Sequence, residues 1–319
     1  MIEIRNLTKR YGEKLALDDI SFSIEAGQVV GLLGLNGAGK STTMNILTGY
    51  ISATSGAVLI GGHDITEAGG KAKRMIGYLP EQPAFYPEMR VDEHLSFVCG
   101  LRGAYPDKKE RAAHINDICA QVGISAVQRR MVRNLSKGYR QRVGFAAALI
   151  GQPKVIILDE PTAGLDPSQI IEMRKLIKGS GKQSTVIVSS HILSEIQTVC
   201  DRVIVIDGGR VVADDTPQQL TAETAEGGLR LRIKGEPEQV SQVLLATEGV
   251  QRVERLAEAE AGVYDYAIFG ESDCDVREAL FYALARAELP ILATHSGGTS
   301  LEDVFLRLTG NTTKEEDAQ

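Results

Sequence analysis

Residues 34–42 read Gly34-Leu35-Asn36-Gly37-Ala38-Gly39-Lys40-Ser41-Thr42 and fit the phosphate-binding pattern G-x-x-x-x-G-K-[ST]. The glycines allow backbone N–H groups to turn towards phosphate oxygens, because a Cβ would block that approach. Lys40 can reach the β- and γ-phosphates of a nucleotide, and the Ser41 hydroxyl can ligate Mg²⁺. A helix that begins near Lys40 would direct its positive N-terminal end at the same anion. The alternative is a glycine-rich turn that binds nothing, but the flanking strand and helix patterns favour a nucleotide site.

The chain around this loop predicts an α/β fold. Nearly continuous apolar runs indicate buried strands, as expected when helices cover both faces of a parallel sheet. These strands are expected at Val29–Leu33, Val155–Leu158, Thr185–Val188 and Val203–Ile206. Helical patterns between them lie at Asp92–Cys99, Lys108–Val122 and Ser136–Ile150. We therefore expect a nucleotide-binding domain over residues 1–220, with a parallel-sheet core and a helical insertion around residues 85–135.

The rest of the chain predicts a second, smaller α+β domain. A polar stretch at residues 214–228 ends in two glycines and is interpreted as a linker. The patterns after it run strand, helix, strand, strand, helix, strand, which is the order of a ferredoxin-like unit. These elements are expected at Leu229–Lys234, Pro237–Thr247, Val250–Leu256, Val263–Phe269, Asp275–Glu288 and Ile291–Thr294. The domain should span residues 229–308, end in a helix at Ser300–Leu308 and precede a flexible tail at 309–319.

One strand of this second domain suggests that both faces of its sheet are covered. Along Val263–Phe269 the side chains of Tyr264, Tyr266 and Ile268 alternate with those of Val263, Asp265, Ala267 and Phe269. Apolar groups on both faces predict that the second face is covered as well, by the final helix or by another copy of the domain.

Length and composition describe an ordinary soluble protein. The 319 residues are enough for about two domains, and 43% of them are hydrophobic and 24% charged. No run approaches the roughly 18 apolar residues that span a bilayer, and the N-terminus lacks the apolar core of a signal peptide. A net charge of −7 argues against a nucleic-acid surface. The cysteines lack metal or redox spacing, and we expect reduced thiols in the cytoplasm at Cys99, Cys119, Cys200 and Cys274.

Two carboxylates follow the strand Val155–Leu158. The apolar run places the chain in the centre of the sheet and brings Asp159 and Glu160 to its C-terminal edge. Asp159 suits a Mg²⁺ shell, and Glu160 suits a general base that polarises the attacking water. An apolar run ending in Asp-Glu is common, so by itself this pair is equally an ordinary strand end. The phosphate loop alone does not distinguish a kinase, a GTPase and a transport motor.

The segment Leu135-Ser136-Lys137-Gly138-Tyr139-Arg140-Gln141-Arg142 closely resembles the signature sequence of ATP-binding cassette (ABC) proteins. The other motifs also occur in the order that is usual in that family. In sequence order the motifs are Tyr11, the phosphate loop, Ile76-Gly77-Tyr78-Leu79-Pro80-Glu81, the signature, Asp159-Glu160, Ala163-Gly164-Leu165-Asp166 and Ser190-His191. The resemblance covers Met1 to about Leu220, and the combined motifs are very specific. More narrowly, the chain resembles the exporter group called ABC-2, and its ending Leu301–Leu308 is similar to the close of many such chains.

The resemblance implies roles for two residues within one cassette. Tyr11 would stack on adenine, and His191 would contact the γ-phosphate and hold the catalytic geometry. Each has a structural alternative, a packing tyrosine and a histidine at a strand end. Alone, neither residue would decide between the two.

The resemblance also implies a head-to-tail pair of cassettes that sandwich two ATP molecules. Ser136, Lys137 and Gly138 would face the γ-phosphate bound to the opposite subunit. Asp166 would cross the dimer interface and link the two sites. The structural alternatives are a helix N-cap with its first turn for the signature and a turn residue before Pro167 for Asp166.

Two motifs depart from the usual family pattern. Most cassette proteins have glutamine where this chain has Glu81, and that side chain bridges Mg²⁺ to the membrane subunits. Glu81 keeps an oxygen ligand but loses the amide donor, and the neighbouring Gln82 is the alternative ligand. The signature has Lys137 and Tyr139 where glycine and glutamine are usual. Both variants recur in the ABC-2 group, so an inactive site is not expected.

Together, these motifs predict an ATPase that couples MgATP binding, cassette closure and hydrolysis to movement of a separate transmembrane permease. ATP and Mg²⁺ are the expected cofactors, and the expected assembly is a homodimer or a pair with a related ATPase on the inner face of the membrane. Phe85 and Tyr86 are expected to help dock the permease. The alternatives are a soluble cassette ATPase acting on ribosomes or DNA and a degenerate structural cassette. For residues 229–308 we expect an interaction, regulatory or dimerisation role.

Overall fold

The computed structural model of the protein describes residues 1–224, 228–270, 275–295, 304–305 and 309. The chain divides into two compact units, Met1–Pro217 and Gln218–Arg307. Each unit has a hydrophobic cluster of its own, and the cluster of the second unit is built from residues between Leu229 and Ile291. In this described part of the chain, no helix combines the length and the apolar character needed to cross a membrane.

The first unit is built on a sheet with the strand order β10-β9-β3-β8-β7-β6. Neighbours from β9 to β6 run parallel, and β10 pairs antiparallel with β9. The bounds are Val29–Leu33 for β3, Ile76–Leu79 for β6, Val155–Asp159 for β7, Thr185–Ser190 for β8, Arg202–Asp207 for β9 and Arg210–Asp215 for β10. Every residue of β3, β7 and β8 is buried, as a central parallel strand requires. The predicted α/β fold is confirmed, and its four predicted strands are all present.

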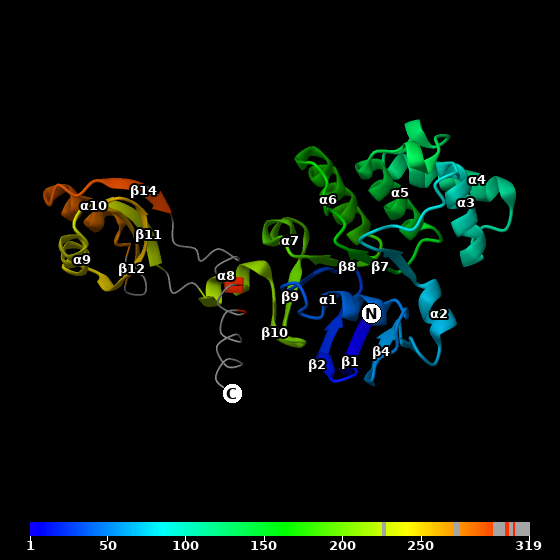
Figure 1. Ribbon diagram of the computed structural model, residues 1–319, viewed down its shortest axis with the longest axis horizontal. Helices are drawn as coiled ribbons and strands as arrows, with labels where there is room; N and C mark the ends of the chain where they lie inside the picture. Colours follow the sequence, from blue (N-terminus) through cyan, green and yellow to red (C-terminus); the bar gives the residue numbers. More distant parts are fainter. Residues whose placement is uncertain (225–227, 271–274, 296–303, 306–308, 310–319) are drawn as a thin grey trace. The chain divides into compact units, whose positions relative to one another are not determined.

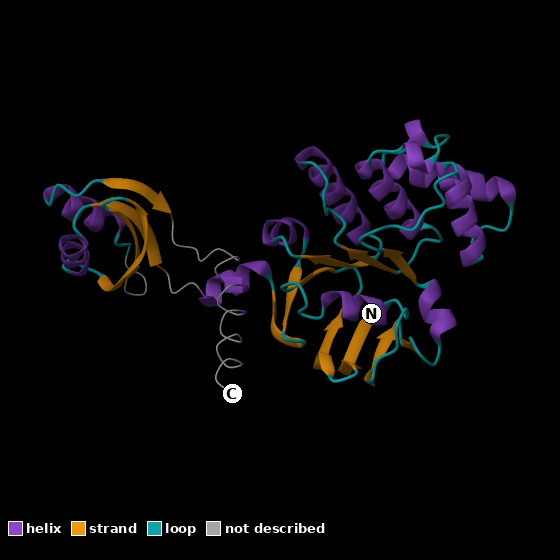
Figure 2. Ribbon diagram, in the orientation of Figure 1, coloured by secondary structure: helices purple, strands orange, loops and turns teal. Residues whose placement is uncertain are grey.

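A second, antiparallel sheet in this unit was not predicted. Its order is β2-β1-β4-β5, with β1 at Ile2–Tyr11, β2 at Lys14–Ile24, β4 at Ser55–Ile60 and β5 at His63–Asp64. Helix α1, Lys40–Leu47, lies between the two sheets (Figure 2) and adds Met44 and Leu47 to the core that they share. The pairing of β1 with β2 shifts register after Ile4 and after Leu7. These irregularities interrupt the period of two by which the strands would be recognised.

The helices of the first unit place the motifs that follow the phosphate loop. They are α2 Gly69–Arg74, α3 Val91–Arg102, α4 Lys108–Gln121, α5 Lys137–Leu149, α6 Pro167–Gly181 and α7 Leu193–Val199. Helices α3 and α4 form the predicted helical insertion, and they pack on each other and on α5 (Figure 1). Asp107 caps α4 by accepting hydrogen bonds from the N–H groups of Lys109 and Glu110. Ser136 and Asp166 cap α5 and α6, so the signature lies at a helix start.

The linker predicted at residues 214–228 contains the boundary between the two units, after Pro217, but much of its described part has regular secondary structure. Asp214 belongs to β10 and forms an ion pair with Arg202 of β9 at 2.6 Å. Helix α8 follows at Pro217–Thr224, and its Leu220 is buried. Pro217 opens this helix, a position where its missing N–H costs no hydrogen bond. Short polar elements resemble loops in composition, which explains why the end of β10 and helix α8 were not predicted.

The second unit has the predicted ferredoxin-like fold. Its elements are β11 Gly228–Lys234, α9 Pro237–Leu245, β12 Val250–Glu260, β13 Val263–Gly270, α10 Arg277–Arg286 and β14 Ile291–His295. The sheet order is β12-β13-β11-β14, and every neighbouring pair is antiparallel. Each strand–helix–strand step therefore skips over one intervening strand. Leu229, Leu231 and Ile233 alternate inwards along β11 and pack with Leu244 and Leu280 of the two helices.

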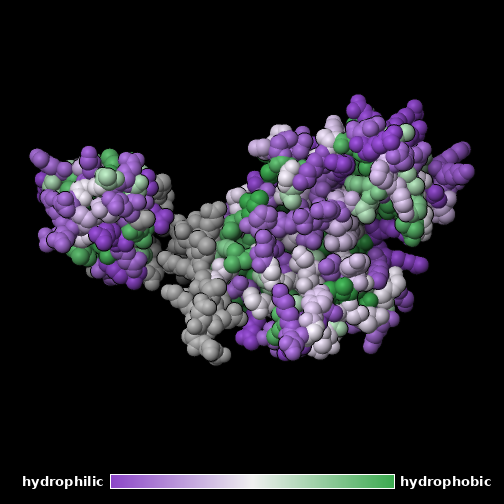
Figure 3. Space-filling view, in the orientation of Figure 1, coloured by the Kyte–Doolittle hydropathy of each residue, from purple (hydrophilic) through white to green (hydrophobic). Residues whose placement is uncertain are grey.

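The two faces of β13 have different surroundings. Tyr266 and Ile268 are buried in the core of the unit. On the other face Asp265 forms an ion pair with Arg232 at 2.8 Å, and the guanidinium of Arg252 lies over the ring of Phe269 at 4.1 Å. Val263 on the same face is buried, and a cover over this face stays a prediction. Figure 3 shows hydrophilic residues over most of the visible surface of this unit. The predicted helix Ser300–Leu308 and the tail at 309–319 lie almost entirely outside the described residues.

Candidate functional site

A pocket of about 530 Å³ gathers segments that are distant in the sequence. The loops after β3, β6, β7 and β8 meet there, because the carboxyl ends of neighbouring parallel strands share one edge of the sheet. The β1–β2 hairpin closes the pocket from the other sheet. The predicted residues that line it are Tyr11, Leu35, Asn36, Gly37, Gly39, Lys40, Ser41, Thr42, Glu81, Glu160 and His191.

The phosphate loop has the shape of an anion cradle. Gly37 and Gly39 adopt φ angles of 87° and 116°, in the left-handed region that favours glycine. A Cβ on Gly39 would stand 2.7 Å from Cδ2 of Leu17, so only glycine fits there. Helix α1 begins at Lys40 without a side-chain cap, and its first-turn N–H groups are therefore available to an anion. These features fit the triphosphate of a nucleotide.

Lys40 is buried inside this loop. Its Nζ donates hydrogen bonds to the carbonyl oxygens of Gly34 at 2.7 Å and Leu35 at 3.2 Å. Burial lowers the pKa of Lys40, whereas the negative charges of Glu160 and Asp159 raise it. A phosphate oxygen in the loop would be a stronger, charge-assisted acceptor for this ammonium than the two carbonyls.

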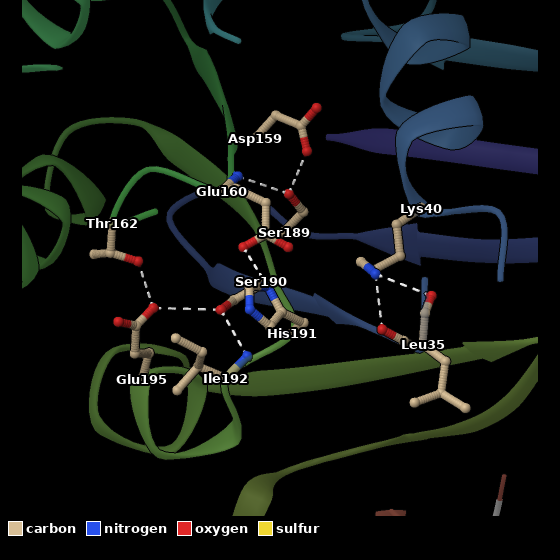
Figure 4. A network of polar contacts seen from close by, with 11 residues as sticks. Leu35, Lys40, Asp159, Glu160, Thr162, Ser189, Ser190, His191, Ile192 and Glu195 are labelled. Carbon is tan, nitrogen blue, oxygen red and sulfur yellow. Dashed lines mark hydrogen bonds and ion pairs between the residues drawn. The ribbon is translucent and has the colours of Figure 1, made fainter. Parts of the chain in front are cut away.

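Glu160 and His191 form a contact between the ends of β7 and β8. The Oε2 atom of Glu160 lies 2.9 Å from Nδ1 of His191 (Figure 4). Glu160 has a φ of 46°, a conformation that costs a residue other than glycine about 1–3 kcal/mol. Its N–H donates to Oγ of Ser189 at 2.9 Å, which helps to hold this backbone. The geometry presents a carboxylate proton acceptor towards the pocket with a histidine beside it.

The oxygen donors of the site fit a hard cation held together with a nucleotide. Ser41 and Glu81 line the pocket, while Asp159 is buried and accepts a hydrogen bond from Ser189 Oγ at 2.5 Å. Among the described residues, no three His, Cys, Asp or Glu side chains could hold a metal by themselves. Mg²⁺ needs few protein ligands because it usually keeps waters and phosphate oxygens. The residues therefore suit Mg²⁺ that arrives with a nucleotide.

The signature residues lie outside this pocket. Oγ of Ser136 accepts a long hydrogen bond from the N–H of Tyr139 at 3.4 Å. The Nζ atom of Lys137 lies against Gly164, where it occupies the space that a Cβ would need. A Cβ on Gly138 would likewise meet the side chain of Gln169. Their assignment to the nucleotide of an opposite subunit stays a prediction.

Asp166 caps helix α6 within its own chain. Its carboxylate accepts hydrogen bonds from the N–H of Gln169 at 2.9 Å and from Oγ of Ser168 at 2.8 Å. These bonds lower the pKa of Asp166, because they favour its charged form. A role for Asp166 across a dimer interface stays a prediction.

Several residues near the site were missed by sequence reasoning. Lys14 and Ala16 line the pocket from β2, a strand whose pattern was not recognised. Thr162 and Glu195 form buried hydrogen bonds behind the Glu160–His191 pair. A usable signal was the polar end of strand β8, Ser189 and Ser190, because a buried hydroxyl needs a partner.

An apolar groove of about 1060 Å³ lies beside the helical insertion. Phe85 packs edge-on against His94 with ring centroids 5.0 Å apart, and Tyr86 packs against Phe97 at 5.5 Å. Nδ1 of His94 is buried without a hydrogen-bond partner. Burial lowers the pKa of this histidine, which favours the neutral ring. The two predicted docking aromatics thus belong to a hydrophobic groove with one unsatisfied polar atom.

Comparisons with known proteins agree with this geometry. The family described as "ABC transporter" matches residues 17–163. The linearmycin resistance ATP-binding protein LnrL of Bacillus subtilis is 32% identical over 99% of this chain and 100% of its own length. The lantibiotic transport ATP-binding protein SrtF of Streptococcus pyogenes is 36% identical over 67% of this chain and 90% of its own length. A solved dimeric ATP-binding cassette in a post-hydrolysis state with ADP and Pi is similar with a TM-score of 0.62 and 25% identity, covering 68% of this chain and 98% of that one.

Proposed function

This chain belongs to the ABC transporter family and is one of its ATPases, and we propose on that basis that it drives a separate transmembrane permease. The observation that carries the proposal is the joint presence of the nucleotide pocket and the apolar groove in one unit. The segment after β6 joins them, because Glu81 lines the pocket and Phe85 lines the groove. Movement caused by nucleotide binding would reach the groove through this short segment.

The chemistry proposed for the pocket is attack of water on the γ-phosphoryl group. Glu160 would polarise the water, and His191 would hold the carboxylate and contact the γ-phosphate. Lys40 would move from the loop carbonyls to the β- and γ-phosphates. Mg²⁺, when bound, neutralises phosphate charge, and the residues that would hold it are Ser41, Asp159 and, through its carboxylate, Glu81.

We propose that the working unit is a pair of cassettes. The signature of one subunit, Ser136 to Gly138, would complete the nucleotide site of the other, and Asp166 would lie between the two sites. In support, the signature begins a capped helix whose N-terminal end can face an anion. Tyr11 is about half exposed beside the pocket, with Lys9 over its ring at 5.1 Å, and would stack on adenine.

The proposed direction of transport is export. It is supported by the relatives named for linearmycin resistance and lantibiotic transport. The proposed location is the inner face of the cell membrane, where the permease would hold the ATPase. A non-transport role on ribosomes or DNA is less well supported, because those names and the apolar groove point to a membrane partner.

Co-expression with a candidate permease, a multi-span membrane protein, tests the proposal. The full chain should co-purify with that protein in detergent, and in liposomes its ATPase rate should depend on the transported compound. The chain should not sediment with ribosomes. ATPase activity without any membrane partner, together with stable ribosome binding, would contradict the transport proposal.

A further inference from the structure

We infer that Glu195 is a positioning residue for the Glu160–His191 pair and that it acts through two buried hydroxyl groups. The inference rests on the roles proposed above for that pair. Glu195 lies in α7, where its side chain points into the protein and is only 6% exposed. It takes part in none of the ion pairs found in the described residues. A buried carboxylate without a cation is costly unless hydrogen bonds hold it.

Two hydroxyl groups hold this carboxylate. Oγ1 of Thr162 donates to Oε2 of Glu195 at 2.5 Å, and Oγ of Ser190 donates to the same oxygen at 3.3 Å (Figure 4). Oγ of Ser190 also accepts a hydrogen bond from the N–H of Ile192 at 3.0 Å. One carboxylate oxygen therefore joins three segments of the chain.

The position of these hydroxyls connects them with the catalytic pair. Thr162 follows Glu160 by two residues, and Ser190 directly precedes His191. The carboxylate of Glu195 thus ties together the two strand ends that carry the pair, on the side away from the pocket. An apolar side chain would fill the same space without the cost of burying a charge, so packing alone does not account for a glutamate here.

The expected contribution of Glu195 is to the catalytic step. His191 is 54% exposed, so few neighbours restrain its side chain, and its backbone position depends on the segment that begins at Ser190. A displacement of about 1 Å in a catalytic constellation can lower a rate by roughly a hundredfold. ATP binding depends mainly on the phosphate loop, which Glu195 does not touch.

The test compares variants of the full-length chain for kcat, for equilibrium ATP binding and for thermal unfolding. Glu195→Met removes both carboxylate oxygens and keeps the volume of the side chain. Glu195→Gln keeps a carbonyl oxygen that can accept hydrogen bonds from both hydroxyl groups. We expect kcat to fall about tenfold or more in Glu195→Met and to recover to within about threefold of wild type in Glu195→Gln. ATP affinity should stay within about twofold in both. Gln197→Ala, an exposed position on the same helix, is the control and should leave kcat unchanged.

Several outcomes would overturn the inference. These are a near-normal kcat in Glu195→Met, an equally low kcat in Glu195→Gln, or equal losses of kcat and ATP affinity. If Glu195→Met does not fold, Thr162→Val is tested in its place and should lower kcat in the same way. Thr162→Ser should then recover kcat, because serine keeps the hydroxyl donor that valine lacks. Glu160→Gln and His191→Ala serve as reference variants. If they turn over ATP normally, the proposed site has failed; if they are impaired while the Glu195 and Thr162 variants are not, the positioning role has failed.

Discussion

Glu160 combines three local features that suit a proton acceptor. It follows a fully buried strand, its backbone is held in a left-handed conformation, and its carboxylate contacts Nδ1 of His191. A strained conformation persists only where neighbours enforce it, and here Ser189 binds the N–H of Glu160. The carboxylate is thereby presented to the pocket at a fixed place, whereas a longer loop would leave it free to move.

The first prediction concerns this carboxylate. Glu160→Gln should bind ATP normally and nearly abolish turnover, because an amide keeps the shape of the side chain but cannot accept the proton. MgATP should then trap the variant as a dimer, observable by size-exclusion chromatography. A steady-state ATPase rate within about twofold of wild type, less than ~0.5 kcal/mol of barrier, would exclude Glu160 as the base.

Lys40→Ala is the contrasting variant for the same assay. Loss of its ammonium should weaken nucleotide binding itself, because Lys40 would no longer neutralise the β- and γ-phosphates. Measured together, the two variants separate the chemical step from binding. An ATP affinity unchanged in Lys40→Ala would refute its proposed contact.

At the scale of elements, the groove beside the helical insertion joins residues from α3, from the segment after β6 and from the end of α1. Its exposed side chains include Tyr50, Tyr86 and Leu101. A partner helix with an apolar face would bury these groups. The surface therefore suits a helical segment better than a flat contact.

The second prediction follows from this groove. Phe85→Ala combined with Tyr86→Ala should leave ATP binding intact and lower the recovery of the permease in co-purification, because it removes two aromatic anchors. A matched control is Phe281→Ala with Tyr282→Ala. Those residues are also adjacent aromatics packed edge-on, and Tyr282 is 53% exposed, compared with 55% for Tyr86. Full recovery of the complex with the groove variant, or equal loss with both variants, would argue against docking in the groove.

The accuracy of the sequence predictions varied with the kind of element. Strands such as Val155–Asp159 were predictable because a strand buried on both faces needs a continuous apolar run. Strand β1 was not, because its register shifts break the alternation on which recognition depends. In the site, the phosphate loop was predictable from local spacing, whereas Glu195 meets Thr162 only after three distant segments pack together. Contacts of that kind leave no pattern in a single sequence.

At the scale of the whole molecule, the chain consists of two units with separate cores. The first unit contains the nucleotide pocket, the signature and the groove. The second has a ferredoxin-like sheet whose outer face carries the Arg232–Asp265 ion pair. Because neither core depends on residues of the other cluster, the first unit should fold and bind ATP without the second.

The last prediction assigns a role to the second unit. We propose that residues 229–308 hold two ATPase subunits together when their cassettes open. The unit offers exposed apolar side chains for such a contact, among them Leu245 and Leu292. Truncation after Glu226 should leave ATP affinity unchanged and weaken the dimer without nucleotide, measured by sedimentation of both chains over a range of concentrations. With MgATP and Glu160→Gln, both lengths should still dimerise, because the cassettes then supply the contact. An identical monomer–dimer equilibrium of the two chains without nucleotide would exclude the dimerisation role, and contact with the permease would become the better assignment.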